Sequence, residues 1–183
     1  MSMAQAEPSV EELLGLAIRH VNAGQSERAR ILCDHAARVH APHPAVLQLL
    51  ASLDLQQGEP ERACSLAEAS LALRPDHPPT LRLLADAWFQ LALREHDLKR
   101  LDAAADALRA VLRLVPERAE AEVNLGIVLQ ESGHLDEAMR AYSRAYRLRE
   151  DSFGRIAHAL STPNVGRLWL RLDDLRASLR AAA

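Results

Sequence analysis

Residues 125–148 read LGIVLQESGHLDEAMRAYSRAYRL. On either side of Gly133, small and apolar residues recur at spacings of three and four, which is the periodicity of two amphipathic helices. A glycine between the two halves favours a tight turn, because glycine adopts a positive φ without steric cost. The stretch therefore predicts a hairpin of two helices.

The hairpin pattern recurs along the chain with a period of 34 residues. Gly24 and Gly58 are 34 residues apart, and so are Ala29 and Ala63. A leucine followed by a small residue marks each copy, at positions 16–17, 50–51, 84–85 and 125–126. Repetition at a period of this length is typical of stacked supersecondary units. We predict an all-α chain of about four helix hairpins.

With these residues in place, the chain resembles the tetratricopeptide-repeat family. The fourth copy matches that family's spacing most fully, at Leu125, Gly126, Gly133, Leu135, Ala138, Tyr142, Ala145 and Leu148. The third copy departs from the pattern where Lys99 replaces the turn glycine, and the fourth where Glu150 replaces the closing proline. The resemblance implies a right-handed solenoid, in which each hairpin covers the apolar face of its neighbour.

The repeats divide the chain into three expected parts. These are an N-terminal tail at 1–9, the repeat array at 10–152 and a C-terminal helical cap at 153–183. Within the array we expect units at 10–43, 44–77, 78–118 and 119–152. A cap is expected because the last unit of a solenoid otherwise exposes its apolar face to water.

Two details of these parts are predicted from residue types. The third unit is seven residues longer than the others, which is about two helical turns. We expect each of its helices to gain one turn across 89–100, so that Leu91 faces Leu98 in a protruding hairpin. In the cap, Ser152 and Asp173 are expected to cap the N-termini of two short helices.

The composition excludes several classes of partner. A net charge of −3 and 3% aromatic residues provide neither the field nor the stacking surface that nucleic acids require. The arginine-rich stretches near residues 140–149 and 167–180 are interrupted by acidic residues, and we expect them to be solvated faces. No stretch reaches the roughly 18 apolar residues of a membrane span.

The cellular location follows from similar evidence. The chain starts without the charged and apolar regions of a signal peptide, and its two cysteines cannot form a disulfide framework. We expect a cytoplasmic protein without membrane partners. The predominance of arginine over lysine, together with abundant alanine, is typical of a bacterial genome rich in G and C.

We predict no active site, cofactor or metal site. The sequence lacks the motifs of serine hydrolases, nucleotide-binding loops, zinc peptidases and dinucleotide-binding folds. Cys33 and His35 are two residues apart on an expected helix, so they point in different directions. His43 and His77 each precede a proline at the start of a unit, where we expect a helix N-terminus. Buried structural thiols are expected at Cys33 and Cys64.

The remaining candidate site is the inner surface of the expected solenoid. In the family that the chain resembles, the first helix of each unit lines a concave groove. Carried over to this sequence, the groove residues are Leu14, Ile18, Leu49, Ser52, Arg82, Leu83, Asp86, Phe89, Val123, Asn124 and Ile127. Most of them are apolar, and a contiguous exposed apolar patch marks a binding site. We expect Arg82, Asp86 and Asn124 to orient the bound segment by hydrogen bonds.

The expected function is that of a non-enzymatic protein-interaction module, acting as an adaptor, a scaffold or a dedicated chaperone. Its partner would be an apolar or amphipathic segment of another protein. Two alternatives stay open from the sequence. The chain's own tail or a second protomer can cover the N-terminal part of the groove. The chain also resembles the secretion chaperones of this family, which are short, cytoplasmic and often dimeric. The chain can also be an accessory subunit of an enzyme or biosynthetic complex, joined through the tail around Trp169.

Overall fold

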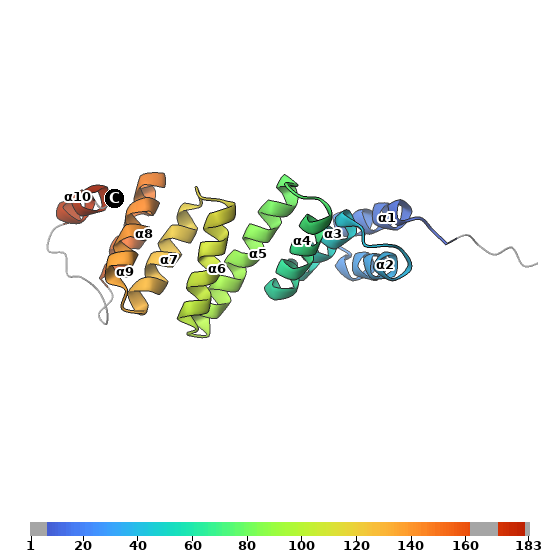
Figure 1. Cartoon of the computed structure of the whole chain (residues 1–183), viewed down its shortest axis with the longest axis horizontal. Helices are drawn as coiled ribbons and strands as arrows, with labels where there is room; N and C mark the ends of the chain where they lie inside the picture. Colours follow the sequence, from blue (N-terminus) through green and yellow to red (C-terminus); the bar gives the residue numbers. More distant parts are fainter. Residues whose placement is uncertain (1–6, 162–171, 182–183) are drawn as a thin grey trace, which may run out of the picture. The chain divides into compact units, whose positions relative to one another are not determined.

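The computed structural model describes residues 7–161 and 172–181, whose regular secondary structure is entirely helical (Figure 1). The first hairpins consist of α1 (Val10–Asn22), α2 (Ser26–Val39), α3 (Pro44–Gln56) and α4 (Pro60–Leu73). They are followed by α5 (Pro78–Asp97), α6 (Leu101–Leu114), α7 (Ala119–Glu131) and α8 (Leu135–Leu148). A short 3-10 turn η1 (Glu150–Ser152), α9 (Phe153–Leu160) and α10 (Leu172–Ala181) complete the described chain. The predicted all-α fold of helix hairpins is confirmed.

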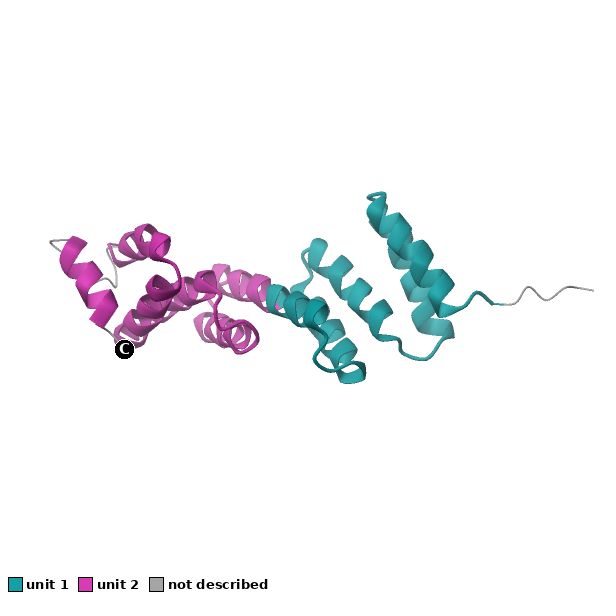
Figure 2. Ribbon diagram, turned by 90° about the horizontal axis from the view of Figure 1, so that it is seen from above, with its two compact units in different colours: residues 1–87 teal, residues 88–183 magenta. Residues whose placement is uncertain are grey.

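The helices form two compact units, which Figure 2 distinguishes by colour. The N-terminal unit covers residues 1–87 and the C-terminal unit covers residues 88–183, so that α5 contributes residues to both. Each unit has a core of its own. Leu13, Leu50 and Leu53 belong to the core of the N-terminal unit. Leu108 and Tyr142 belong to the core of the C-terminal unit, together with residues of α9 and α10.

Small residues occupy the positions where the sequence predicts close helix packing. Ala17, Ala51 and Ala85 have almost no exposed surface, and so do the alanines at the matching position of the second helices, Ala29, Ala63, Ala104 and Ala138. A larger side chain at such a position would push two helices apart. The repeated leucine–small-residue pair thus marks buried packing sites.

The turn between the two helices of a hairpin requires a left-handed backbone. Gly24, Gly58 and Gly133 adopt φ values of +71°, +78° and +84°, as predicted. Lys99 takes the same place in the third hairpin with φ +58°, although a side chain is unfavourable in this region. The turn geometry is therefore kept even where glycine is absent.

The seven extra residues of the third unit lengthen one helix only, so the prediction of one extra turn in each helix is wrong. α5 has 20 residues, whereas α1, α3 and α7 have 13 each. α6 has 14 residues, as do α2, α4 and α8. Leu98 lies in the turn and is 54% exposed, so it does not face Leu91. The reason is the turn at Lys99, because every inserted residue precedes it.

Two substitutions at Lys99 isolate the cost of this turn. Both Lys99→Gly and Lys99→Ala remove the ion pair between Lys99 Nζ and Glu131 Oε2, which are 3.3 Å apart. Only the alanine variant keeps a Cβ in the left-handed region. We expect the glycine variant to be more stable than the alanine variant by about 1 kcal/mol in urea unfolding. Equal midpoints for the two variants would show that the turn carries no backbone strain.

The C-terminal residues cap the array, as the fold prediction states. Ile156 and Leu160 of α9 and Leu175 and Leu179 of α10 are buried in the core of the C-terminal unit. The predicted caps are not formed, since Ser152 makes no capping side-chain hydrogen bond to α9. Asp173 lies inside the first turn of α10, where it pairs with Arg176 at 3.0 Å. Trp169 lies outside the described residues.

Candidate functional site

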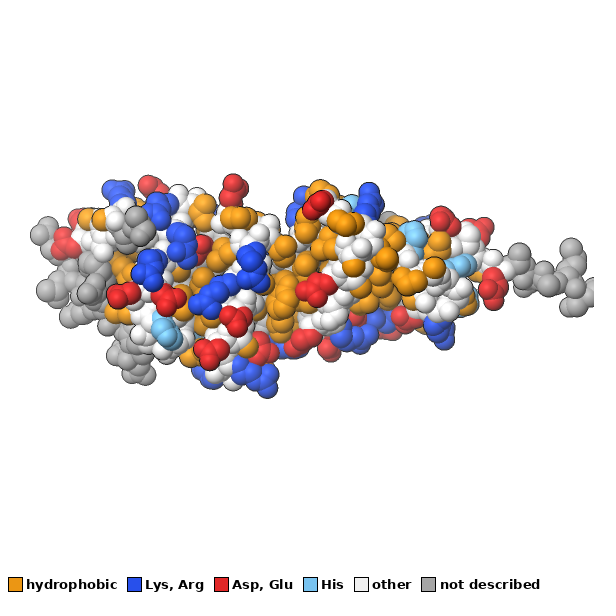
Figure 3. Space-filling model, viewed as in Figure 1, with side chains coloured by type: hydrophobic (Ala, Val, Ile, Leu, Met, Phe, Trp, Pro, Cys, Tyr) orange, Lys and Arg blue, Asp and Glu red, His pale blue; other side chains and the backbone are white. Residues whose placement is uncertain are grey.

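In the N-terminal unit, α1 and α3 each present apolar side chains beside the buried residues that pack against neighbouring helices. Leu14 of α1 and Leu49 of α3 are half-buried and pack against the same core cluster. Ile18 follows Leu14 by one helical turn and is 45% exposed, and Ser52 follows Leu49 in the same way and is half-buried. We call these four residues the α1–α3 face. On the side of the N-terminal unit seen in Figure 3, hydrophobic side chains gather around α3 and α4.

The N-terminal part of α5 carries three further residues of the predicted groove. Arg82 and Asp86 are exposed and are one turn apart, and Leu83 is half-buried. They belong to the same unit as the α1–α3 face. The N-terminal unit therefore offers accessible apolar surface together with charged side chains of both signs.

In the C-terminal unit, the predicted groove residues are more deeply buried. Val123 is 1% exposed and belongs to the core, so its assignment to an open groove is wrong. Ile127 and Phe89 are partly buried against the same core. The Arg118 guanidinium carbon lies 4.2 Å from the centre of the Phe89 ring. These residues pack within the protein and present little free surface.

Helix α9 is the element that occupies this part of the predicted groove. Arg155 of α9 donates a hydrogen bond from Nη2 to Asn124 Oδ1 at 3.1 Å. Gln130 of α7 donates from Nε2 to the carbonyl oxygen of Ala159 at 2.9 Å. The sequence left open, as an alternative, that the chain's own tail covers the N-terminal part of the groove. In the structure, α9 instead covers groove residues of the C-terminal unit. Asn124 is therefore engaged by the protein itself.

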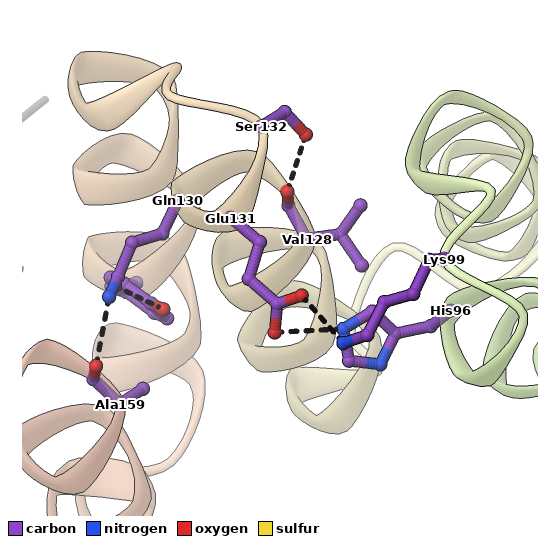
Figure 4. A network of polar contacts seen from close by, with 8 residues as sticks. His96, Lys99, Val128, Gln130, Glu131, Ser132 and Ala159 are labelled. Carbon is purple, nitrogen blue, oxygen red and sulfur yellow. Dashed lines mark hydrogen bonds and ion pairs between the residues drawn. The ribbon is translucent and has the colours of Figure 1, made fainter. Parts of the chain in front are cut away.

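Two polar networks lie at the end of α7, and the one around Gln130 holds α9 against α7 (Figure 4). Gln130 also accepts a hydrogen bond from the Tyr142 hydroxyl at 3.0 Å, so one amide joins α7, α8 and α9. The Glu131 carboxylate lies 3.0 Å from His96 Nε2 and 3.3 Å from Lys99 Nζ. Burial by itself raises the pKa of Glu131, but the hydrogen bonds and charges of His96 and Lys99 outweigh it and lower the pKa below its ordinary range.

A buried ion cluster in the N-terminal unit was not predicted. Asp54 is completely buried and pairs with Arg30 from α2 and with Arg62 from α4, the latter at 3.4 Å. The sequence does indicate that Asp54 is buried, because Asp54 continues the helical spacing of Leu50 and Ala51 on the face that packs against the neighbouring helices. Breaking a buried pair leaves an uncompensated charge, so the cluster constrains how the second helices sit on α3.

The cysteines and histidines have structural surroundings. Cys33 and Cys64 are buried free thiols, as predicted. His43 is the N-cap residue of α3, and His77 Nδ1 lies 2.8 Å from Thr80 Oγ1 at the start of α5. Among the described residues, no group of three histidine, cysteine or acidic side chains is arranged to hold a metal ion. Nor does any described helix combine the length and hydropathy that crossing a bilayer requires.

The buried thiols predict a loss of stability at alkaline pH. Burial raises the pKa of Cys33 to about 11 and that of Cys64 to about 12, from an ordinary value of 9.0. Above pH 9.0 the unfolded chain releases thiol protons that the folded chain retains, so the free energy of unfolding falls as pH rises. We expect a doubly substituted Cys33→Ala, Cys64→Ala protein to show a shallower alkaline decline in its melting temperature. Parallel curves for the two proteins would contradict this origin.

Comparison with known proteins locates one repeat in the sequence. Residues 119–152, which form the fourth predicted unit, match a family model described as tetratricopeptide repeat. A search of proteins with curated functions returns no match.

Solved structures share the fold at low sequence identity. The MamA AMB-1 structure is 24% identical, with a TM-score of 0.57 over 82% of this chain and 80% of its own. A MamA RS-1 double mutant is 17% identical, with a TM-score of 0.63 over 96% and 94% of the two chains. YrrB, described as a TPR protein with an unusual peptide-binding site, is 18% identical, with a TM-score of 0.56 over 82% and 73%. These similarities establish the succession of helix hairpins as a known repeat fold.

Proposed function

We propose that the chain is a tetratricopeptide-repeat protein and acts as a non-enzymatic protein-interaction module. Its binding surface is the α1–α3 face of the N-terminal unit, and the exposed Arg82 of α5 orients the partner. The partner contributes an apolar segment, either an amphipathic helix or an extended strand of chain. The module works as an adaptor, scaffold or dedicated chaperone in the cytoplasm of a bacterium.

The exposure of Ile18 carries this proposal. Full burial of a side chain of this size is favourable by about 1.5–3 kcal/mol. Ile18 is 45% exposed in the free protein, so a partner that covers it gains part of this free energy. Leu14 and Leu49 beside it add further apolar surface at the edge of the core. The solved structure of YrrB, which has a peptide-binding site, supports this type of function for the shared fold.

The structure also favours the N-terminal unit over the C-terminal unit as the docking surface. In the C-terminal unit, α9 already engages Asn124, and Val123 is part of the core. A partner there would have to displace the cap and break the hydrogen bond between Gln130 and Ala159. A partner at the α1–α3 face has no such cost.

A pair of charge substitutions tests this proposal. Ile18→Glu places a carboxylate on the α1–α3 face, where it stays hydrated in the free protein but is desolvated on binding, at a cost of several kcal/mol. Ile31→Glu is the matched control, because Ile31 is 64% exposed on the second helix of the same hairpin. We expect photo-crosslinking in cells to capture a protein from a probe at residue 14, to lose it in Ile18→Glu and to keep it in Ile31→Glu.

Two outcomes would contradict the assignment of the site. The first is an unchanged crosslink in Ile18→Glu with circular dichroism like that of the parent protein. The second is a crosslinked product whose mass is that of two copies of this chain, because the α1–α3 face would then be a homodimer interface.

A further inference from the structure

A cavity lies in the C-terminal unit, between α6, α7 and α8, and has a volume of about 370 Å³. Four arginines line it, with Arg109 and Arg113 on α6 and Arg140 and Arg144 on α8. Figure 3 shows blue arginine side chains gathered on this side of the C-terminal unit, with a few acidic side chains between them. We call this cavity the arginine pocket.

The charges of the arginine pocket do not cancel. Arg144 binds the buried Glu122 through Nε and Nη2, at 2.6 and 2.9 Å. Arg109 lies 3.1 Å from Asp106 and 3.8 Å from Glu137. Arg113 and Arg140 remain, and within the described part of the chain neither has a carboxylate at ion-pair distance. The pocket thus offers two guanidinium groups without a counter-charge.

The lining between these cations is apolar. Leu112 of α6 and Leu125 and Leu129 of α7 line the pocket beside the arginines. A ligand that satisfies the whole surface therefore needs both a carboxylate and an adjacent apolar group. Arginine suits this task, because its planar fork binds carboxylates in a bidentate manner while its weakly hydrated face packs against apolar groups.

We propose that the arginine pocket binds a short acidic segment of a partner protein, with glutamate or aspartate at Arg113 and Arg140 and an apolar side chain against the leucines. It is a binding site separate from the α1–α3 face, since its residues come from α6, α7 and α8. With both sites, the protein would hold partners through an apolar contact in one unit and an acidic contact in the other.

The pocket favours a peptide over a nucleic acid. Affinity for a phosphate backbone grows with the number of phosphates neutralised, and only two arginines here are free to contribute. Glu122 and Glu137 also line the pocket and repel a continuous row of phosphates. An acidic peptide carries few charges and can place apolar side chains beside them. It therefore matches a pocket lined by both arginines and leucines.

The test measures fluorescence anisotropy at low salt with two labelled peptides, each with a leucine on either side of a central pair. The central pair is two glutamates in one peptide and two glutamines in the other. We expect the glutamate peptide to bind at least about tenfold more tightly than the glutamine peptide. Added salt should weaken the binding, because partly exposed charges are screened.

Matched variants assign the binding to the pocket. Arg113→Ala combined with Arg140→Ala should weaken the binding of the glutamate peptide at least about tenfold. Arg38→Ala combined with Arg74→Ala changes the net charge equally on exposed positions of the N-terminal unit and should leave binding unchanged. Glu137→Gln should tighten binding a few-fold, because it removes a negative charge from the lining. Circular dichroism confirms that each variant is folded.

Three results would overturn the proposal. One is equal affinity for the glutamate and glutamine peptides, and another is an equal loss in the control double variant. The third is an oligothymidylate that binds more tightly than the glutamate peptide, which would make the pocket a nucleic-acid site. None of these measurements involves the α1–α3 face, so they stand independently of the function proposed for it.

Discussion

Gly126→Ala is expected to lower the free energy of unfolding by about 1–3 kcal/mol, although the same change elsewhere in a helix is stabilising. A Cβ at this position would lie 2.5 Å from Cδ1 and 2.9 Å from Cζ of Tyr142, and closer still to Cε1. The ring cannot yield, because Tyr142 is completely buried and its hydroxyl donates to Gln130. The α7–α8 crossing would therefore have to open.

Gly15→Ala is the matched control for this substitution. Gly15 is also inside a helix, but nothing lies within 4 Å of the Cβ that alanine would add. We expect this variant to gain about 0.5–1 kcal/mol from helix propensity alone. Urea unfolding of both variants gives the comparison, and destabilisation of equal size in the two would show that the close approach of Tyr142 is not the cause.

A chain that ends at Ser152 is expected to lose the folded C-terminal unit. The deletion removes the buried side chains of Ile156, Leu160, Leu175 and Leu179. At about 1.5–3 kcal/mol each, these four account for much of a typical stability of about 5–15 kcal/mol. The deletion also removes Phe153 and Arg180, which pack against the Tyr146 ring, so we expect aggregation in size-exclusion chromatography and a lower melting temperature.

Point variants separate packing from chain length in this result. Ile156→Ala and Leu175→Ala should each cost about 2–5 kcal/mol, because both side chains are fully buried. Leu172→Ala in α10 should cost little, since Leu172 is 54% exposed. A truncated protein that is monomeric with an unchanged melting temperature would show that α9 and α10 contribute nothing to the core.

Local rules explain why so much of the fold is predictable. The hairpins follow from helical periodicity, and the turns follow from Gly24, Gly58 and Gly133, each of which has the expected positive φ. The seven inserted residues were assignable too. Gly58 and Lys99 are 41 residues apart, and Lys99 and Gly133 are 34 apart, so the insertion must precede the turn at Lys99.

The candidate site was predictable only in part. Leu14, Ile18 and Leu49 are found at the edge of the N-terminal core, where the spacing beside the packing stripe places them. Val123 has the same kind of position on α7, yet it is buried in the C-terminal core. Periodicity predicts which face of a helix is apolar, but it does not predict which other segment covers that face.

By itself, the sequence determined the helices, their pairing into hairpins and the small residues at the helix crossings, because these depend on neighbours within one repeat. Only the tertiary structure decided that α9 engages Asn124 and Gln130, and that arginines of α6 and α8 meet in one pocket. These contacts join residues of different repeats. Their geometry depends on how whole helices pack, and helix packing is set by the sum of many side-chain contacts that no single repeat contains.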